Sequence, residues 1–274
     1  MIYNKYNPIR VFTAFSGYDS QCLALEKLKQ SFSDFDYTLV GWSEIDKYAI
    51  QAHNALFPEA SDKNYGDISK IDWSQVPDFD LFTYSFPCTD ISSAGQQKGL
   101  SEGSGTRSSL LWECRKAIEI KRPKFLLMEN VKALVSKVFI PYFKEWERYL
   151  ASLGYSNFAK VLNATDYGVP QNRERIFMVS ILDEQAGFHF PEPLPLERSL
   201  ADVLETDVPE KYYLSQKMVD YFHSVSSGGH KRESAVITRE DKVSCTILAN
   251  QYKCGGGTTV LKEFTDEQQT KNNV

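Results

Sequence analysis

The sequence predicts an α/β fold for the part of the chain up to residue 190, and two observations carry this prediction. Apolar runs alternate there with amphipathic segments, as expected when the strands of a parallel sheet are joined by crossover helices. Residues 9–15 form an apolar run that ends in Ser16-Gly17, and apolar residues at helical spacing follow in residues 21–32. A strand, a glycine turn and a helix therefore open the chain.

The remaining elements repeat this pattern in order. Residues 37–42 predict a strand, and residues 46–57 predict the helix that follows it. Further strands are expected at 79–84, 125–128, 157–162 and 176–182, and helices at 108–120 and 142–153. In the last of these helices, Phe143, Trp146 and Leu150 share one face, which is typical of a helix that packs on a sheet.

A change of pattern after Phe190 predicts a domain boundary. Pro191, Pro193 and Pro195 follow each other closely, and regular periodicity is lost beyond them. We expect a catalytic domain at residues 1–190 and a smaller region at residues 191–274. The smaller region contains a β-like stretch at residues 234–247.

Composition excludes several classes of protein. The 274 residues are 42% hydrophobic and 24% charged, which excludes a wholly disordered chain. No apolar run approaches the roughly 18 residues of a membrane span, and the N-terminus carries no basic-then-apolar signal. We therefore expect a soluble cytoplasmic protein. The net charge of -5 argues against nucleic-acid binding by bulk charge, although a local basic groove stays open.

Five cysteines occur without a Cys-x-x-Cys pair, so the sequence suggests neither a disulfide framework nor a zinc site. Cys22 and Cys114 lie on apolar faces of expected helices, and we expect both thiols to be buried and inert. Cys88 differs, because it lies in the loop 85–95 that directly follows the strand 79–84. A thiol at the ligand-binding edge of a sheet is a candidate nucleophile.

Acidic residues follow two of the expected strands. Glu44 lies where a carboxylate would accept the hydroxyl groups of a ribose, and Asp67 follows another short connection. Together with the turn at Phe15 and Gly17, they suggest a site for an adenosine-containing cofactor. The alternative is that Glu44 caps the helix beginning near residue 46 and that Asp67 stabilises a turn.

Two further segments place charged groups beside strands. Residues 126–131 deliver Glu129 at the end of a buried strand, and an acid beside the Cys88 thiol suggests a joint site. Residues 167–175 lead into the strand 176–182, and Arg173 and Arg175 would point to the same side of an extended chain, which suits a phosphate. A solvated polar strand entry is the alternative for the arginines.

Together these residues resemble the cytosine-C5 DNA methyltransferase family. The Phe-x-Gly turn, the Pro-Cys loop, the Glu-Asn-Val strand end and the Gln-x-Arg-x-Arg strand entry all occur here in the family's order. The resemblance covers residues 9–190 well, and the last three motifs in this order are highly specific. It implies a Rossmann-like, S-adenosylmethionine-dependent methyltransferase fold, with a small and incomplete target-recognition region that reads duplex DNA.

The resemblance also implies roles for individual residues. S-adenosylmethionine would lie over Phe15, Gly17, Glu44 and Asp67, while Pro87 and Leu110 would line the far side of its pocket. Substrate binding would involve Gln171 of the strand-entry motif and Thr246, which looks like the threonine with which the recognition domain holds the backbone near the extruded base. Every one of these assignments rests on the matching of motifs.

The implied mechanism follows from the chemistry of cytosine, whose C5 is a poor nucleophile until the ring is activated. The thiolate of Cys88 would add to C6, and Glu129 would hydrogen-bond N3 as electron density reaches C5. Arg173 or Arg175 could raise the thiolate fraction and hold the flanking phosphate. The base must also leave the stack, at a cost of a few kcal/mol that the recognition region would offset.

The sequence departs from the family pattern at two places. The family usually continues Phe-x-Gly with further glycines, whereas Tyr18, Asp19 and Ser20 follow Gly17 here. We expect the acid of Asp19 to lie near the methionine moiety and contact its amino group. In addition, no Pro-Arg-Glu helix and no terminal Gly-Asn-Ser segment occur. This leaves open a second polypeptide that supplies them, a truncated relic, and a single chain that works without them.

Three alternatives from other classes stay open at this point. A non-catalytic subunit that binds S-adenosylmethionine or DNA would tolerate an incomplete C-terminus, but it gives no reason for Cys88 and Glu129 to occur in intact motifs. A thiol hydrolase would need a histidine base, and all four histidines lie outside the motifs. An RNA substrate is the third alternative, because the chemistry at C5 is the same. No membrane partner is expected.

Overall fold

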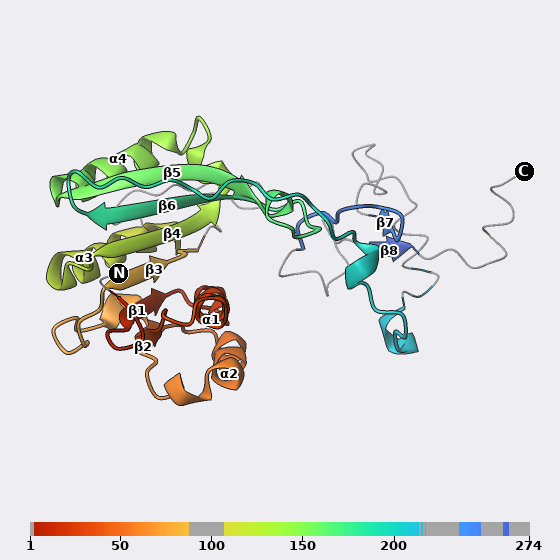
Figure 1. Ribbon diagram of the computed structural model, residues 1–274, viewed down its shortest axis with the longest axis horizontal. Coiled ribbons are helices and arrows are strands. Elements are labelled where there is room, and N and C mark those ends of the chain that lie inside the picture. Colours follow the sequence, from red (N-terminus) through yellow and green to blue (C-terminus); the bar gives the residue numbers. More distant parts are fainter. Residues whose placement is uncertain are drawn as a thin grey trace, which may run out of the picture. The chain divides into compact units, whose positions relative to one another are not determined.

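The computed structural model divides into two compact units (Figure 1). The first unit comprises residues 1–161 and 175–190, and the second comprises residues 162–174 and 191–274. The domain boundary expected after Phe190 stays a prediction, while the segment 162–174 groups with the second unit. The structure describes residues 3–87, 107–213, 215, 217, 236–247 and 260–262.

A sheet of six strands has the order β2-β1-β3-β4-β6-β5. Pairing is parallel from β2 through β1 and β3 to β4, and β6 runs antiparallel to β4. The predicted α/β class is confirmed, and the sheet is mixed because β6 is antiparallel to its neighbour β4. The strands are Ile9–Ala14 (β1), Tyr37–Ser43 (β2), Leu81–Tyr84 (β3), Phe125–Val131 (β4), Tyr155–Asn163 (β5) and Glu174–Leu182 (β6).

The connection from β5 to β6 explains the antiparallel strand. It contains only the short 3-10 helix η5 (Ala164–Asp166) and no α-helix. A parallel neighbour requires a crossover of a dozen or more residues, usually helical, and this connection is too short to supply one. The chain therefore reverses its direction within residues 164–173, and the predicted strand entry at Arg173 leads into β6.

In the described ranges of the chain, four α-helices cover the two faces of the sheet. Successive residues of β1 point to opposite faces, so that Val11 packs in one hydrophobic cluster and Phe12 in the other. Cys22 of α1 lies with Val11, whereas Cys114 of α3 and Trp146 of α4 lie with Phe12. The helices are Ser20–Ser31 (α1), Lys47–Leu56 (α2), Cys114–Lys121 (α3) and Ile140–Ser152 (α4).

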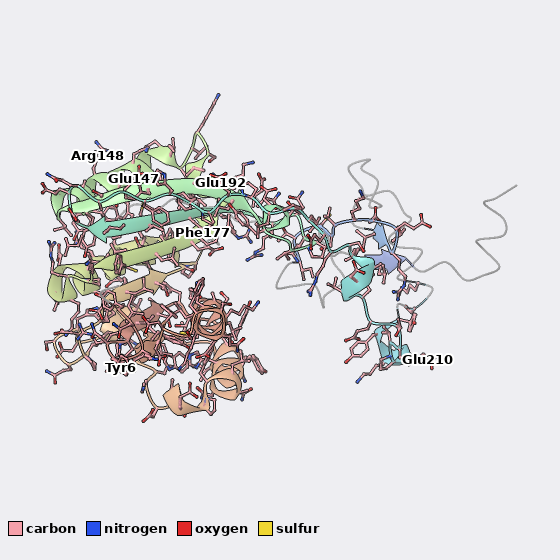
Figure 2. All side chains as sticks on the ribbon, in the orientation of Figure 1. Tyr6, Glu147, Arg148, Phe177, Glu192 and Glu210 are labelled. Atoms are coloured by element: carbon pink, nitrogen blue, oxygen red, sulfur yellow. The ribbon has the colours of Figure 1, made fainter. Side chains whose placement is uncertain are left out.

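The fourth helix shows the predicted amphipathic pattern. Phe143, Trp146 and Leu150 are buried, as expected from their shared face. Arg148 lies on the exposed side of the same helix (Figure 2). The helical spacing of the sequence thus identified the core-facing side of α4 correctly.

Two other elements differ from their predicted limits. β4 continues to Val131, so Glu129 lies inside the strand and not beyond its end. The helix expected at 108–120 begins as a 3-10 helix, η3 (Arg107–Glu113), and becomes α-helical only at Cys114. Shorter 3-10 helices are η1 (Pro58–Ala60), η2 (Ile68–Lys70) and η4 (Lys132–Val135).

The second unit contains little regular structure in its described residues. Its elements besides η5 are the 3-10 helices η6 (Ala201–Val203) and η7 (Glu210–Tyr212) and the parallel strands β7 (Val236–Thr238) and β8 (Val260–Lys262). In the part of the β-like stretch expected at 234–247 that the structure describes, residues 236–247, the strand is β7. Within the part of the chain that the structure describes, none of the helices has the length and apolar character of a membrane span.

Candidate cofactor and catalytic site

The turn between β1 and α1 has an unusual backbone. Phe15, Gly17 and Asp19 have positive φ angles of 55°, 59° and 66°. Such left-handed conformations are costly for residues other than glycine, and they persist where the surrounding structure fixes them. A Cβ atom at Gly17 would meet nothing within 4 Å, so the φ angle, and not space, favours glycine there.

Glu44 follows β2 and is fixed by three backbone donors. Its Oε2 accepts the N–H of Gly17 at 2.9 Å, and its Oε1 accepts the N–H groups of Ile45 at 2.7 Å and Asp46 at 2.8 Å. Because β1 and β2 are parallel neighbours, both of their carboxyl ends lie at one edge of the sheet. The residue that caps α2 is Asp46 and not Glu44, because Asp46 Oδ1 accepts the N–H groups of Tyr48 and Ala49. The role of Glu44 toward a cofactor stays a prediction.

Asp67 lies close to the same edge, since the Ser43 hydroxyl at the end of β2 donates to the carbonyl of Gly66 at 2.7 Å. The carboxylate of Asp67 caps η2, with Oδ1 accepting from the hydroxyl and N–H of Ser69. These hydrogen bonds lower the pKa of Asp67 from its ordinary value, and Lys70 adds a weaker attraction. Asp67 therefore has the contacts of the turn-stabilising alternative, and a cofactor role for it stays a prediction.

Asp19 corrects one expectation from the sequence. Its side chain is fully buried, with 0% exposure, and hence cannot reach the amino group of a bound methionine moiety. Instead, Oδ2 accepts the hydroxyl of Thr13 at 2.7 Å, and Oδ1 accepts the N–H of Cys22 at 3.1 Å. The acid belongs to the support of the turn and not to its ligand-facing surface.

The buried thiols behave as the sequence predicted. Cys22 and Cys114 are both buried. Burial, reinforced by the carboxylate of Asp19, raises the pKa of Cys22, and burial likewise raises the pKa of Cys114 well above its ordinary value. Neither thiol is a candidate nucleophile. Cys88 lies outside the described residues.

The residues just before Cys88 are tied to two neighbouring elements. The buried side chain of Asn130 in β4 donates from Nδ2 to the carbonyl of Phe86 at 3.0 Å. Gln21, in the first turn of α1, donates from Nε2 to the hydroxyl of Ser85 at 3.0 Å. The start of the Pro-Cys loop is thus fixed to the strand that carries Glu129 and to the helix that follows the cofactor turn.

Glu129 and Arg175 form an ion pair across β4 and β6. Arg175 Nε lies 3.1 Å from Glu129 Oε1, and the two side chains are 18% and 23% exposed. Arg175 lies opposite Val131 in the antiparallel register, which makes it the diagonal neighbour of Glu129 on the same face. Sequence reasoning named both residues but not their contact, because the contact depends on the direction and register of β6.

Two of the hydrophobic residues predicted to contact the cofactor, Phe15 and Leu110, lie at the border of one hydrophobic cluster. Phe15 and Leu110 are both partly buried and pack against the cluster that contains Phe12 and Trp146. Pro87 is partly buried at the end of the described segment after β3. The structure thus gives Phe15 and Leu110 a common support, and their contact with a cofactor stays a prediction.

In the second unit, the strand-entry motif pairs with the segment that carries Thr246. Gln171 forms a parallel bridge with Ser244, and the hydroxyl of Thr246 donates to the carbonyl of Asn172 at 2.7 Å. Arg173 is partly buried, and its N–H donates to Asn163 Oδ1 at 3.0 Å. The predicted substrate residues Gln171 and Thr246, distant in the sequence, therefore belong to one local structure.

Sequence reasoning missed three supporting side chains. Thr13 and His53 contact Asp19, and Asn130 holds the segment before Cys88. Asn130 was visible as the second residue of the Glu-Asn-Val motif, so a signal for it existed. No pattern in the sequence pointed to Thr13 or His53, because their contacts with Asp19 arise only from the packing of β1, α1 and α2.

Comparison with known proteins gives a consistent result. Residues 9–273 match the model of the family "C-5 cytosine-specific DNA methylase". The type II methyltransferase M2.ScrFI of Lactococcus lactis subsp. cremoris is 41% identical, over 80% of this chain and 76% of that protein. The type II methyltransferase M.NlaX of Neisseria lactamica is 32% identical, over 96% of this chain and 80% of that protein.

A solved structure shows the same fold. The crystal structure of the S. pombe Dnmt2 methyltransferase superposes with a TM-score of 0.71 at 16% identity, covering 96% of this chain and 79% of that chain. At this identity the likeness concerns the fold alone. The expected methyltransferase fold is thereby confirmed.

Proposed function

Since the chain belongs to the C-5 cytosine-specific DNA methylase family, we propose a complete methyl-transfer reaction for it and assign its steps to residues. The enzyme class is a DNA cytosine-5 methyltransferase that depends on S-adenosylmethionine. The observation that carries the residue assignment is the ion pair that Glu129 of β4 forms with Arg175 of β6. β4 is the neighbour of β3, the strand that precedes Cys88 in the sequence.

We assign the cofactor to the carboxyl ends of β1 and β2. Glu44 is held in one orientation by three backbone N–H groups, which leaves Oε2 an acceptor position for a ribose hydroxyl. Asp67, Phe15 and Leu110 complete the proposed pocket, together with Pro87. When bound, S-adenosylmethionine supplies the methyl group as an electrophilic carbon attached to a sulfonium.

We assign the activation of cytosine to Cys88. Its thiolate would form a bond to C6, and the displaced electron pair would reach C5, which then takes the methyl carbon. The C5 proton would leave to solvent, and the returning electron pair would expel the thiolate and restore the aromatic ring. As the methyl carbon bonds to C5, its bond to sulfur would break and leave the electron pair on a neutral thioether, and Cys88 would end the cycle as a free thiolate.

Glu129 would stabilise the activated ring from the N3 side. Arg175 Nε engages Oε1, so Oε2 is the oxygen that we assign to N3. A fixed carboxyl group at N3 can donate or share a proton as negative charge develops during the attack at C6. Arg175 is thereby engaged with Glu129, and we assign the phosphate that flanks the target base to Arg173.

The base would have to leave the duplex stack, since C5 and C6 are not accessible inside it. We propose that the second unit holds the extruded strand, with Gln171 and Thr246 as contacts. Their local pairing at the segment 170–172 supports a common role. The relatives named type II methyltransferases act in restriction-modification, and we propose the same context here. No second polypeptide enters the proposal, because nothing in the comparisons supports one.

Methyl transfer by the purified chain tests this function. Unmethylated genomic DNA and S-adenosylmethionine should yield 5-methyldeoxycytidine, measured by nucleoside mass spectrometry. Cys88→Ala should abolish the product, whereas Cys254→Ala, a matched change at a cysteine without an assigned role, should not. Full transfer by Cys88→Ala would contradict the mechanism.

Parallel arms separate the alternatives. Transfer to RNA but not to DNA would contradict the proposed DNA substrate and favour RNA in its place. Calorimetric binding of S-adenosylmethionine without transfer to either nucleic acid would favour a non-catalytic binding subunit.

A further inference from the structure

We propose that Asp19 is a positioning residue for the cofactor turn, in which a buried carboxylate takes over the structural task that additional glycines would perform. This inference rests on the proposed function, because it concerns the site assigned to S-adenosylmethionine. Asp19 itself cannot touch the cofactor, since its side chain is 0% exposed. Its effect must therefore pass through the residues that it holds.

The backbone of Asp19 requires such support. With φ 66° and ψ 62°, it adopts the left-handed conformation that glycine accepts freely and most side chains avoid. Asp and Asn are the exceptions, because their short polar side chains can form local hydrogen bonds. The N–H of Asp19 donates to the Ser16 carbonyl at 2.7 Å, which closes the turn around Gly17.

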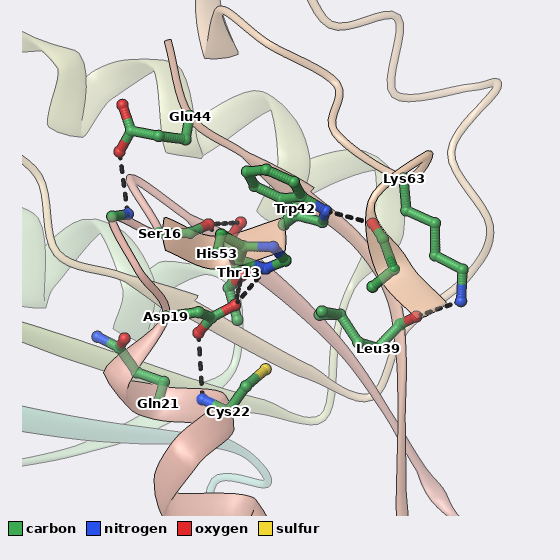
Figure 3. A network of polar contacts seen from close by, with 12 residues as sticks. Thr13, Ser16, Asp19, Gln21, Cys22, Leu39, Trp42, Glu44, His53 and Lys63 are labelled. Carbon is green, nitrogen blue, oxygen red and sulfur yellow. Dashed lines mark hydrogen bonds and ion pairs between the residues drawn. The ribbon is translucent and has the colours of Figure 1, made fainter. Parts of the chain in front are cut away.

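The carboxylate connects the turn to β1 and α1. Oδ2 accepts the Thr13 hydroxyl, and Oδ1 accepts the N–H of Cys22 in the first turn of the helix (Figure 3). The Thr13 and Ser16 hydroxyls lie 2.9 Å apart, and the Ser16 N–H donates to the Ser43 carbonyl at 3.2 Å. A continuous chain of buried polar contacts therefore runs from Asp19 through the turn to the end of β2.

The helix α2 provides the third contact of the carboxylate. Nε2 of His53, also 0% exposed, lies 3.5 Å from Asp19 Oδ2. The imidazole stacks on Trp42 with ring centroids 3.6 Å apart, and Trp42 is itself fixed by its bond to the Ala60 carbonyl. Among the described residues, neither ring nitrogen of His53 has a hydrogen-bond partner. The carboxylate is thus the polar group that His53 faces.

This arrangement controls the groups assigned to the cofactor. The N–H of Gly17, two residues before Asp19, is the donor that orients Glu44 Oε2. A shift of the turn would displace both Gly17 and Glu44, although neither contacts Asp19 directly. Displacement of binding groups by a distant change can cost roughly 100-fold in function.

Three variants of Asp19 separate positioning from helix capping. Asp19→Ala removes both the acceptors and the tolerance of a positive φ. Asp19→Gly keeps the backbone conformation but loses every side-chain contact. Asp19→Asn keeps the φ preference and the acceptor for Cys22, and its amide can donate to Thr13 and His53.

Calorimetry and steady-state kinetics provide the readouts. We expect Asp19→Ala to raise the Kd and the KM for S-adenosylmethionine by roughly 10- to 100-fold, with kcat at saturating cofactor and the KM for DNA nearly unchanged. Asp19→Gly should lie between Asp19→Ala and the wild type, and Asp19→Asn should recover most of the affinity. If Asp19→Ala does not fold, Thr13→Val, which removes only the hydroxyl, should still weaken cofactor binding.

Asp80→Asn is the matched control for lost stability, because Asp80 binds Arg10 at the opposite ends of β1 and β3. It should lower the melting temperature without changing the cofactor Kd. A Kd within twofold of wild type in folded Asp19→Ala and Thr13→Val would overturn the inference and leave the proposed function standing. A wild-type chain that binds no S-adenosylmethionine would instead overturn both.

Discussion

The proposed active site has two sides, which are built in different ways. We call them the cofactor edge, at the ends of β1 and β2, and the β4–β6 edge, at Glu129 and Arg175. At the ends of β1 and β2, the polar groups behind the cofactor turn are fully buried, and Asp19 and His53 are both 0% exposed. At the β4–β6 edge, the side chains of Glu129 and Arg175 are 23% and 18% exposed and meet in one ion pair. The first edge is fixed by many short backbone contacts, while the second depends on two long side chains.

In the proposed function, this difference separates binding from catalysis. A network of backbone donors holds its geometry before a ligand arrives, which suits a cofactor that must bind in one orientation. A partly exposed ion pair contributes little to stability, so we infer that its main effect is to orient the carboxylate of Glu129. Changes at the first edge should therefore alter cofactor affinity, and changes at the second should alter the rate of transfer.

The largest expected effect belongs to the β4–β6 edge. Glu129→Gln should lower methyl transfer about 100-fold or more, because the amide cannot supply a proton or a negative charge at N3. Cofactor affinity and the melting temperature should hold. Single-turnover experiments measure the transfer rate, and calorimetry measures the cofactor affinity and the melting temperature. Glu145→Gln, on the exposed side of α4, is the matched control. A normal transfer rate in Glu129→Gln would remove it from the reaction.

The next effect sharpens the description of the cofactor edge. Glu44→Gln should raise the Kd for S-adenosylmethionine roughly 10- to 100-fold. In the wild type both carboxylate oxygens accept backbone N–H groups, and in the variant the NH2 group of the glutamine would have to face one of these donors. The rate at saturating cofactor should change little. Glu59→Gln, at an exposed position in η1, is the control. If the loss appeared in kcat and not in affinity, the separation of the two edges would fail.

A smaller effect is expected at Asp67. Asp67→Ala should raise the cofactor Kd by about two- to fivefold, since the carboxylate already serves Ser69 and Lys70 and has less capacity for a ligand. Asp72→Ala is a closely matched control, because Asp72 binds the hydroxyl and N–H of Ser74 in the same local arrangement. Equal affinities in both variants, measured by calorimetry, would exclude Asp67 from the pocket.

The smallest effect concerns stability and should leave both edges unchanged. Burial raises the pKa of Asp80, but the hydrogen bonds and charge of Arg10 outweigh it, so the pKa lies below its ordinary value. The stabilisation is therefore fully present above the pKa of an unfolded aspartate, about 3.9, and is lost as the pH falls below it.

Urea unfolding at neutral pH and near pH 3 measures this contribution. Asp80→Asn should be less stable than wild type at neutral pH, and the difference should shrink in acid. A difference that did not depend on pH would show that the charge of Asp80 is not its source.

Local patterns in the sequence determined a large part of this molecule. The spacing of apolar residues predicted the buried face of α4, which carries Phe143, Trp146 and Leu150, and the burial of Cys22. It also predicted the succession of strands along the chain. The pattern also predicted that Glu44 lies just past the end of a strand, and it directly follows β2. These features depend on neighbours in the chain, and the sequence records them directly.

Only the tertiary structure decided the contacts between distant segments. The reversal of β6 brings Arg175 to Glu129, and the packing of α2 brings His53 to Asp19. An acid expected to face the cofactor is instead enclosed, because β1, α1 and α2 close around it. The pairing of Gln171 with Ser244 is of the same kind. Such contacts depend on strand direction, register and helix packing, which periodicity along one segment does not specify.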